Sequence, residues 1–496
     1  MQGKRRGKGN RKVKRAKVVI IGAGPAGLAS AYKLAHSNFD VHVLEASPHV
    51  GGLSRSFELW GQTVDLGPHR FFSSDKIVND FWREVVGQDY SIVNRMTRIY
   101  YRNKFFYYPL QPLNAFLNLG IVDVSRCIFS YGAAKLRPFE PRTFEDWVIG
   151  RFGRRLFEIF FRTYTEKVWG IPCARLDAEW ASQRIKKLSL FEAVKAAFLK
   201  DAANKHKTLV DQFAYPKGGT GKFYERTAEH IRARGGRIEF NVPVVQIITD
   251  TKNGKQRAVG VKLQDGRKID ADYVVSTMPL TLMAKSVEAA PRSVLDACNK
   301  LYYRNTILAY LEIDTKDVFP DNWIYVHSPE VRHGRIANFR NWCASLTRGK
   351  ETSILCIEFW CYENDPLWHE PNIAIGKLAE KELRTIRLIP DNVNCLNSFV
   401  LKIPRSYPVY EVGYKKHVEE IKKFLNSIGN LFAIGRNGAF KYNNQDHSIL
   451  MGLLAAEEII TGEPQDIWDI NTDSEYQEKN KIADTGIVPQ ETPDKA

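Results

Sequence analysis

A glycine-rich turn near the start of the chain most limits the possible fold. The residues KVVII, 17–21, have the apolar pattern of a buried strand, and GAGPAG, 22–27, follows directly. An Ala- and Leu-rich segment that predicts a helix comes next, and a second strand, VHVLE, ends at Glu45. Glycines in such a turn let the backbone approach a pyrophosphate at the positive helix N-terminus, and the acid can accept hydrogen bonds from ribose hydroxyls. The pattern therefore predicts a dinucleotide-binding βαβ unit.

A second pair of glycines, Gly51 and Gly52, follows the acid in SPHVGGLSRSF. A doublet at this place resembles the second cofactor-contacting turn of the large FAD-containing oxidase superfamily. That superfamily often has an arginine before the doublet, where this chain has Val50. The strand-like stretches NVPVVQI, 241–247, and DADYVVSTMP, 270–279, resemble its later strands. The resemblance favours FAD as the bound dinucleotide.

Several further motifs occur in an order that narrows the resemblance. They are VDLGPHRFF (64–72), YYPLQ (107–111), EKVWGIP (166–172), WASQRI (180–185), YPKGGTG (215–221), RSYP (405–408) and GRNGAFKYNNQDHS (435–448). Together they resemble UDP-galactopyranose mutase, the eukaryotic branch more than the bacterial one, over about residues 17–462. Most of the oxidase superfamily has Gly-Asp at the last flavin contact, whereas this chain has Gly435-Arg436, as the mutases do.

The resemblance and the hydrophobic patterns together predict an α/β fold. We expect a Rossmann-like FAD-binding domain that is discontinuous in sequence, a helical substrate or cap segment, and a substrate domain built on an antiparallel sheet. The expected boundaries are 17–75, 212–285 and 425–465 for the FAD-binding domain, 76–211 for the helical segment, 290–420 for the sheet-rich domain, and 1–16 and 466–496 for a basic and a polar tail.

The resemblance implies interconversion of the pyranose and furanose forms of a nucleotide sugar, without net redox change. Reduced flavin would serve as the nucleophile in place of a side chain. The protein must then bind an anionic diphosphate, hold the sugar against the flavin, and keep the flavin reduced with NAD(P)H or another donor.

The motifs also imply roles for individual residues. Arg184, Tyr407 and Tyr442 match the family's diphosphate-binding residues, and a guanidinium suits this role because it forks onto two phosphate oxygens. His69 and Arg436 match residues beside the flavin and complete the expected catalytic set. Further residues expected at the substrate are Tyr108, Gln111, Trp169 and Asn444.

The expected FAD contacts lie in four parts of the chain. They are Gly22, Gly24, Pro25, Ala26 and Gly27 in the first turn, Glu45, Ala46, Gly51, Gly52 and Leu53 after the second strand, Val244, and Gly435, Arg436, Asp446, His447 and Ser448 near the C-terminus.

The C-terminal motif predicts an apolar helix with a polar tip. Asn443, Asn444 and Asp446 can satisfy free amides at the helix start, while Ile449 and Leu453 bury one face. The helix N-terminus would point at the flavin, where its partial positive charge favours the anionic reduced form.

This sequence departs from the mutase pattern at several positions. The mutases' second diphosphate arginine lies at the end of a strand that resembles NTILAYLEID, 305–314, where this chain has Asp314. Arg335 or Arg340 could substitute. Thr165 and Leu110 replace a family asparagine and an aromatic residue. Because of these changes, the sequence does not determine which sugar and which base the substrate contains.

Composition adds limits of its own. Net charge is +16, and residues 1–17 carry nine Lys or Arg and no acid, which predicts a solvated arm whose contact with nucleic acid or membrane is not expected. Seven cysteines without a CxxC pair indicate a reduced cytoplasmic protein without a metal site. No apolar run is long enough to predict a transmembrane segment. The sequence does not determine whether the protein forms a homo-oligomer.

Two other functions remain alternatives. A FAD-dependent oxidoreductase of the amine-oxidase, protoporphyrinogen-oxidase or desaturase kind would share the glycine motifs and would not need a second diphosphate arginine. A non-catalytic binding protein on the same fold, like the escort and dissociation-inhibitor proteins, is the third hypothesis.

Overall fold

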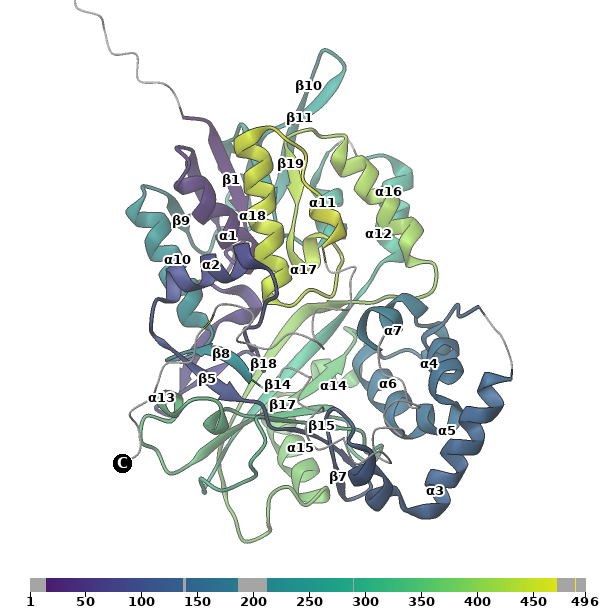
Figure 1. Ribbon diagram of the computed structural model, residues 1–496. Helices are drawn as coiled ribbons and strands as arrows, with labels where there is room; N and C mark the ends of the chain where they lie inside the picture. Colours follow the sequence, from purple (N-terminus) through teal and green to yellow (C-terminus); the bar gives the residue numbers. More distant parts are fainter. Residues whose placement is uncertain (1–14, 137–139, 186–211, 289, 471–486, 488–496) are drawn as a thin grey trace, which may run out of the picture.

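A five-stranded parallel sheet forms the upper part of the molecule (Figure 1). The computed structural model describes residues 15–136, 140–185, 212–288, 290–470 and 487, so most of both expected tails lies outside it. The strand order is β19 (Leu431–Ala433), β13 (Tyr273–Ser276), β1 (Lys17–Ile21), β2 (Asp40–Leu44) and β9 (Arg237–Glu239). Three distant stretches of the chain therefore share one sheet, as a discontinuous nucleotide-binding fold requires.

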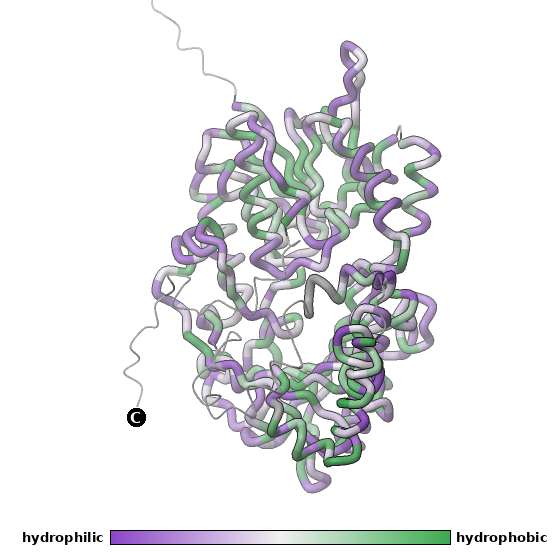
Figure 2. The backbone as a smooth tube through the Cα atoms, turned by 45° about the vertical axis from the view of Figure 1, so that its right-hand side comes forward, coloured by the Kyte–Doolittle hydropathy of each residue, from purple (hydrophilic) through white to green (hydrophobic). Residues whose placement is uncertain are grey.

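Two helices pack tightly against each other beside this sheet. They are α1 (Pro25–Ala35), which begins at the glycine turn, and α18 (Gln445–Thr461), which carries the polar tip. A Cβ added to Gly452 of α18 would lie 2.1 Å from the carbonyl oxygen of Ala26. Only glycine permits this approach, which brings the N-termini of both helices towards the same space. In Figure 2 the middle of this upper part of the molecule is mostly hydrophobic.

A seven-stranded sheet forms the lower part (Figure 1). Its order is β18 (Cys395–Pro408), β14 (Tyr303–Ile313), β17 (Ser353–Cys361), β16 (Arg335–Asn338), β15 (Trp323–Val326), β6 (Thr97–Tyr101) and β7 (Lys104–Tyr107). All pairs are antiparallel except β15 with β6. Every residue of β14 and β17 is buried, and α15 (Asn372–Thr385) packs against part of one face.

The segment expected to be helical, 76–211, differs from that expectation in its first part. After α2 (Lys76–Val86) the chain forms β5 (Tyr90–Asn94), β6 and β7. Aromatic and β-branched residues dominate this stretch and favour strands over helix. The helices α3 (Pro112–Lys135), α4 (Phe144–Phe152), α5 (Arg154–Phe157), α6 (Thr163–Trp169) and α7 (Ala178–Ile185) follow, with a π-helical turn at Glu158–Arg162.

Smaller elements complete the part of the chain that the structure describes. Two-stranded sheets pair β3 (Ser56–Leu59) with β4 (Gln62–Asp65) and β5 with β8 (Gln212–Pro216), and a three-stranded sheet contains β10 (Val244–Lys252), β11 (Lys255–Leu263) and β12 (Lys268–Asp270). The remaining α-helices are α10 (Gly221–Ala233), α11 (Leu280–Ser286), α12 (Arg292–Lys300), α13 (Ala344–Thr347), α14 (Pro366–His369), α16 (Tyr414–Asn426) and α17 (Gly435–Gly438).

One of the described helices is long and apolar enough to cross a membrane, judged by length and composition alone. It covers Leu113–Lys135 within α3, and only 6% of its most apolar window is buried. The apolar positions of this helix are interrupted by Asp123 and Arg126, so the sequence contains no uninterrupted apolar run there.

Candidate functional site

A cavity of about 370 Å³ lies between the two sheets. Its wall combines the glycine turn before α1, the loop after β4, the N-terminus of α18, and side chains from β15, β16 and β18. The expected residues that line it are His69, Tyr407, Tyr442, Arg436, Asn444, Arg335, Gly22, Gly24, Pro25, Ala26, Glu45, Gly52, Leu53, Gly435, Asp446 and Ser448. The fold thus gathers into one cavity residues that are far apart in the sequence.

The two glycine turns are packed against each other at one end of the cavity. Gly22 has a φ of 100°, and a Cβ on Gly27 would lie 2.0 Å from the carbonyl oxygen of Gly22. A Cβ on Gly52 would lie 3.1 Å from the Cα of Gly24. The bare backbone therefore leaves room for a pyrophosphate at the N-terminus of α1, and these residues fit a dinucleotide.

Glu45 is held in place by two backbone amides. Its Oε2 accepts a hydrogen bond from the amide of Ala23 at 2.7 Å, and its Oε1 accepts one from the amide of Ser47 at 2.8 Å. A carboxylate oxygen can accept more than one hydrogen bond, so both oxygens can still receive ribose hydroxyls. This arrangement explains why an acid ends the second strand.

Other expected cofactor residues support the cavity without lining it. Gly27 lies beneath the turn, and the amide of Gly51 donates to the carbonyl of Ala23 at 2.8 Å. Nδ1 of His447 accepts from the amide of Asn444 at 3.1 Å, which closes the start of α18. Ala46 follows Glu45, and Val244 begins β10; neither lines the cavity.

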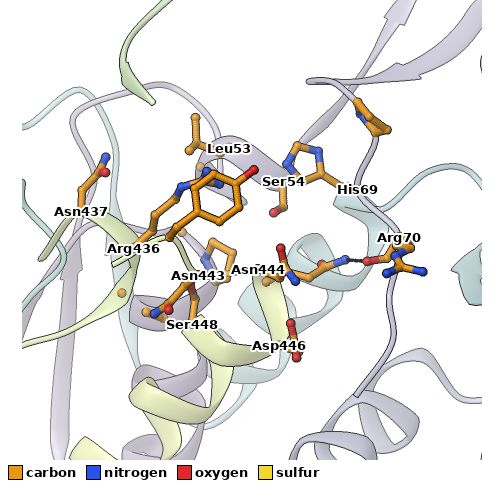
Figure 3. A pocket seen from close by; sticks show the side chains of 18 of the residues that line it. Leu53, Ser54, His69, Arg70, Arg436, Asn437, Asn443, Asn444, Asp446 and Ser448 are labelled. Atoms are coloured by element: carbon orange, nitrogen blue, oxygen red, sulfur yellow. Dashed lines mark hydrogen bonds between the residues drawn. The ribbon is translucent and has the colours of Figure 1, made fainter. Parts of the chain in front are cut away.

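The polar tip of α18 faces the cavity. Asn444 is its N-cap, Asp446 lies in its first turn, and the side-chain amide of Gln445 donates to the carbonyl of Arg70 at 2.8 Å (Figure 3). The free N-terminal amides of this helix carry partial positive charge. An anionic ring system bound against this tip would be stabilised.

Arg436 packs against two neighbouring tyrosine rings. Its guanidinium carbon is 4.4 Å from the ring centre of Tyr407 and 4.5 Å from that of Tyr442, and the two ring centres are 5.3 Å apart. Burial raises the pKa of Tyr407 to about 12, so its hydroxyl stays protonated at neutral pH. Nε and Nη2 of Arg436 are buried without a hydrogen-bond partner among the described residues. The cluster offers a cation and phenolic donors to an anion.

Trp169 supports this cluster from behind. It is buried, and its ring centre lies 6.4 Å from that of Tyr407 and 5.9 Å from that of Tyr442. Trp180 of α7 packs edge-on against Tyr442 at 4.7 Å. Trp169 does not line the cavity itself.

Arg335 and Arg340, the two candidates for a second diphosphate arginine, lie in different surroundings. Arg335 lines the cavity and forms two hydrogen bonds of 2.6 Å with the buried Glu358. Arg340 lies outside the cavity wall and donates to the carbonyls of Lys350 and Thr352. Arg335 is thus better placed than Arg340 to contact a diphosphate, but the carboxylate of Glu358 already balances its positive charge.

The remaining expected substrate residues lie at or beyond the cavity edge. The ring of Tyr108 is 5.3 Å from that of Tyr325, which lines the cavity, and Gln111 is an exposed residue at the start of α3. Arg184 belongs to α7, and its side chain lies outside the described part of the structure.

The sequence interpretation missed Arg70, which also lines the cavity. Its Nη1 is buried without a hydrogen-bond partner among the described residues. Burial and the nearby positive charge of Arg95 lower the pKa of Arg70 to about 10. Arg70 follows His69 directly in VDLGPHRFF, so its place next to an expected flavin contact could have identified it from the sequence. A second cation therefore faces the cavity away from Arg436 (Figure 3).

His69 gives the first testable prediction. Burial lowers the pKa of its ring to about 4, and its Nδ1 lies 3.0 Å from the carbonyl oxygen of Gly67. A neutral ring that donates from Nδ1 to this carbonyl leaves Nε2 as an acceptor. The pKa of His69 in the folded protein lies below the unfolded value of about 6.5. The neutral ring therefore contributes fully to the stability of the fold above about pH 6.5, and this contribution is lost as the pH falls towards 4.

We expect histidine ¹⁵N NMR of the FAD-loaded protein to show His69 neutral, with its proton on Nδ1, from about pH 5 upward. His69→Gln serves to assign the signal. A His69 signal that titrates between about pH 6 and 7, as an exposed ring does, would contradict the buried arrangement.

Comparisons with known proteins agree with this site. The sequence matches the family model for flavin containing amine oxidoreductase over residues 25–459. A crystal structure of reduced UDP-galactopyranose mutase superposes with a TM-score of 0.79 at 23% identity, covering 92% of this chain and 99% of that chain.

Sequence relatives include a probable mutase and several oxidases. The "Probable UDP-galactopyranose mutase" of Klebsiella pneumoniae is 28% identical over 181 residues, which cover 32% of this chain and 43% of that protein. This chain therefore matches less than half of the Klebsiella protein. Coproporphyrinogen III oxidase of Staphylococcus aureus is 23% identical over 487 residues, covering 89% of this chain and 98% of the other. The resemblance to the mutases and the wider oxidase superfamily is thus confirmed, and the chain belongs to the flavin-containing amine oxidoreductase family.

Proposed function

We propose that this FAD-dependent enzyme acts on a nucleotide sugar and interconverts its pyranose and furanose rings without net redox change. The observation that carries the proposal is the cluster of Arg436, Tyr407 and Tyr442 in the cavity wall, in which Nε and Nη2 of Arg436 have no hydrogen-bond partner among the described residues. An unpaired buried cation is costly, and a bound anion relieves this cost. Arg70 provides a second such cation in the same wall.

The protein's own residues would divide the work between binding and electrostatics. Reduced flavin, when bound, supplies a nucleophile and returns unchanged. The hydroxyls of Tyr407 and Tyr442 would donate hydrogen bonds to a diphosphate, and Arg184 would add a forked pair. The N-terminus of α18 and the charge of Arg436 would stabilise the anionic reduced ring. Such a site would keep the leaving diphosphate close enough for its return.

The direct test is incubation of the dithionite-reduced protein with UDP-galactose and a panel of other nucleotide sugars, followed by chromatography of the products. We expect one sugar nucleotide to be converted into an isomer, with no consumption of reductant beyond the initial reduction. NAD(P)H is expected to replace dithionite. If every sugar nucleotide came through unchanged, the proposal would fail.

Arg184 provides a second, independent test of substrate binding. We expect Arg184→Ala to weaken nucleotide-sugar binding by about 10- to 100-fold, since a forked ion pair with phosphate contributes about 1.5–3 kcal/mol. Spectral titration of the flavin measures this change, and the FAD content should stay that of the natural protein. Arg292→Ala, which removes an exposed arginine of α12, is the matched control. Equal loss of FAD and substrate would show a structural role instead.

A net oxidoreductase remains the second candidate. It is favoured by the pairing of Arg335 with Glu358, which leaves the cavity without a free arginine at that place. Coproporphyrinogen III oxidase of Staphylococcus aureus is also a relative over most of the chain. Sustained oxygen or acceptor consumption with an amine, a porphyrinogen or a polyene, together with no turnover of nucleotide sugars, would support this candidate.

A further inference from the structure

Helix α3 exposes apolar side chains on both sides of Gly120. The side chains of this α3 face are exposed as follows: Leu113 68%, Leu117 68%, Ile121 71%, Ile128 58%, Phe129 80% and, just after the helix, Leu136 84%. Apolar side chains this exposed are usual when scattered singly, but a contiguous group marks an interaction site. In Figure 2 this part of the chain comes forward, and hydrophobic segments alternate in it with hydrophilic ones.

The shape of α3 argues against a membrane-spanning role and for an in-plane one. The helix is broken at Gly120, where φ is 78° and ψ is 165°. The longer piece, residues 121–135, is roughly 22 Å long at 1.5 Å per residue, whereas a bilayer core is about 30 Å thick.

The other side of α3 is fixed to the protein. Cys127 is buried, the hydroxyl of Ser130 accepts from the amide of Arg155 at 3.1 Å, and Asp123 pairs with the same arginine at 2.7 Å. A helix held on one side and apolar on the other fits the plane of a membrane interface.

The charges around the α3 face are mostly positive. Residues 97–136 contain five basic residues and a single acid, Asp123. One of the five, Arg98, is paired with the buried Asp321, which leaves Arg102, Lys104, Arg126 and Lys135. Asp123 is already paired with Arg155, and it also lies near Arg102 and Arg126, whose side chains are 58% and 66% exposed. Exposed cations beside an apolar helix suit anionic lipid headgroups, while their stems cover apolar surface. A two-fold symmetric contact between copies would instead bring these like charges together.

We propose that the α3 face lies in the headgroup region of an anionic phospholipid bilayer and attaches this protein to the membrane surface. The attachment would also place one side of the cavity near the bilayer. Tyr108 precedes α3 and contacts Tyr325 of the cavity wall. The proposal does not depend on the reaction that the enzyme catalyses.

The test is co-sedimentation of the full-length FAD-loaded protein with vesicles of phosphatidylcholine and phosphatidylglycerol in equal parts, and with phosphatidylcholine alone. We expect binding to the anionic vesicles that persists in part at high salt, because apolar insertion is not screened. The variant Leu117→Glu/Ile121→Glu/Phe129→Glu should bind at least about tenfold more weakly. Ile77→Glu, which changes a 52% exposed residue on α2, is the matched control and should bind normally.

Flavin content and thermal unfolding should be the same for all three proteins, so that misfolding does not explain a loss. Absence of vesicle binding by the natural protein would overturn the proposal. So would unchanged binding by the triple variant, which would assign the attachment to the basic N-terminal tail. A dimer that forms without vesicles and is abolished by the triple variant would show that a second copy covers the α3 face.

Discussion

Replacing Arg436 with methionine should reduce turnover by roughly 100- to 1000-fold and lower the midpoint potential of the bound flavin. Loss of one preorganised donor at a developing charge costs this much in other enzymes. The guanidinium packs against the rings of Tyr407 and Tyr442 and has no carboxylate partner among the described residues, so its full charge acts on the cavity. Removal of that charge disfavours the anionic reduced flavin more than the neutral oxidised one. Potentiometric titration and single-turnover kinetics measure the two effects.

Two variants control for the Arg436 result. Arg436→Lys keeps the charge but loses the planar stack, so the potential should fall less than in Arg436→Met while turnover still drops. Arg405→Met removes an exposed arginine from the same strand as Tyr407 and should change neither quantity. A potential that is unchanged in Arg436→Met would show that the guanidinium does not act on the flavin. This outcome is independent of the substrate.

The second large effect is expected at Gly27. The variant Gly27→Ala should be purified without FAD, with affinity reduced at least about 100-fold. An added Cβ would lie 2.0 Å from the carbonyl oxygen of Gly22, and this contact is with backbone that cannot rotate away. The turn must then open, which removes the close approach that a pyrophosphate needs. Flavin absorbance of the purified protein and FAD titration of the apo form test this prediction.

Gly132→Ala is the control for Gly27→Ala. Gly132 lies in α3, where an added Cβ meets nothing within 4 Å. Alanine is favoured over glycine in a helix by about 1 kcal/mol, so this variant should keep its FAD and unfold at an equal or higher temperature. Normal FAD content in Gly27→Ala would mean that the turn relaxes at little cost.

The sequence predicted the parts of the fold that local rules govern. The turn at 22–27 is recognisable because only glycine allows the positive φ of Gly22 and the close packing of Gly27 against the carbonyl oxygen of Gly22. The polar tip of α18 is recognisable because caps and the first helical turn have characteristic residues. The strands β6 and β7 were missed, because a long-range pairing with β15 decides their place in the lower sheet.

In the candidate site, too, sequence motifs identified individual residues, while the tertiary structure decided which contacts they make. Motif positions led to Tyr407, Tyr442 and Arg436, but their stacking depends on β18 and α17 meeting in space. Arg335 and Arg340 are equivalent in the sequence, and only the fold pairs the first with Glu358 and turns the second towards backbone carbonyls. Arg70 was overlooked because its burial without a partner is a property of the assembled cavity.

By itself, the sequence determined the dinucleotide turn, the polar start of α18 and the membership of the flavin-containing oxidase superfamily, which the family match confirms. These features depend on contacts between residues that are near each other along the chain. Only the tertiary structure decided which charges remain unpaired in the cavity and which apolar side chains of α3 remain uncovered. Pairing and burial are set by residues distant in sequence, because folding brings them within a few ångströms of one another.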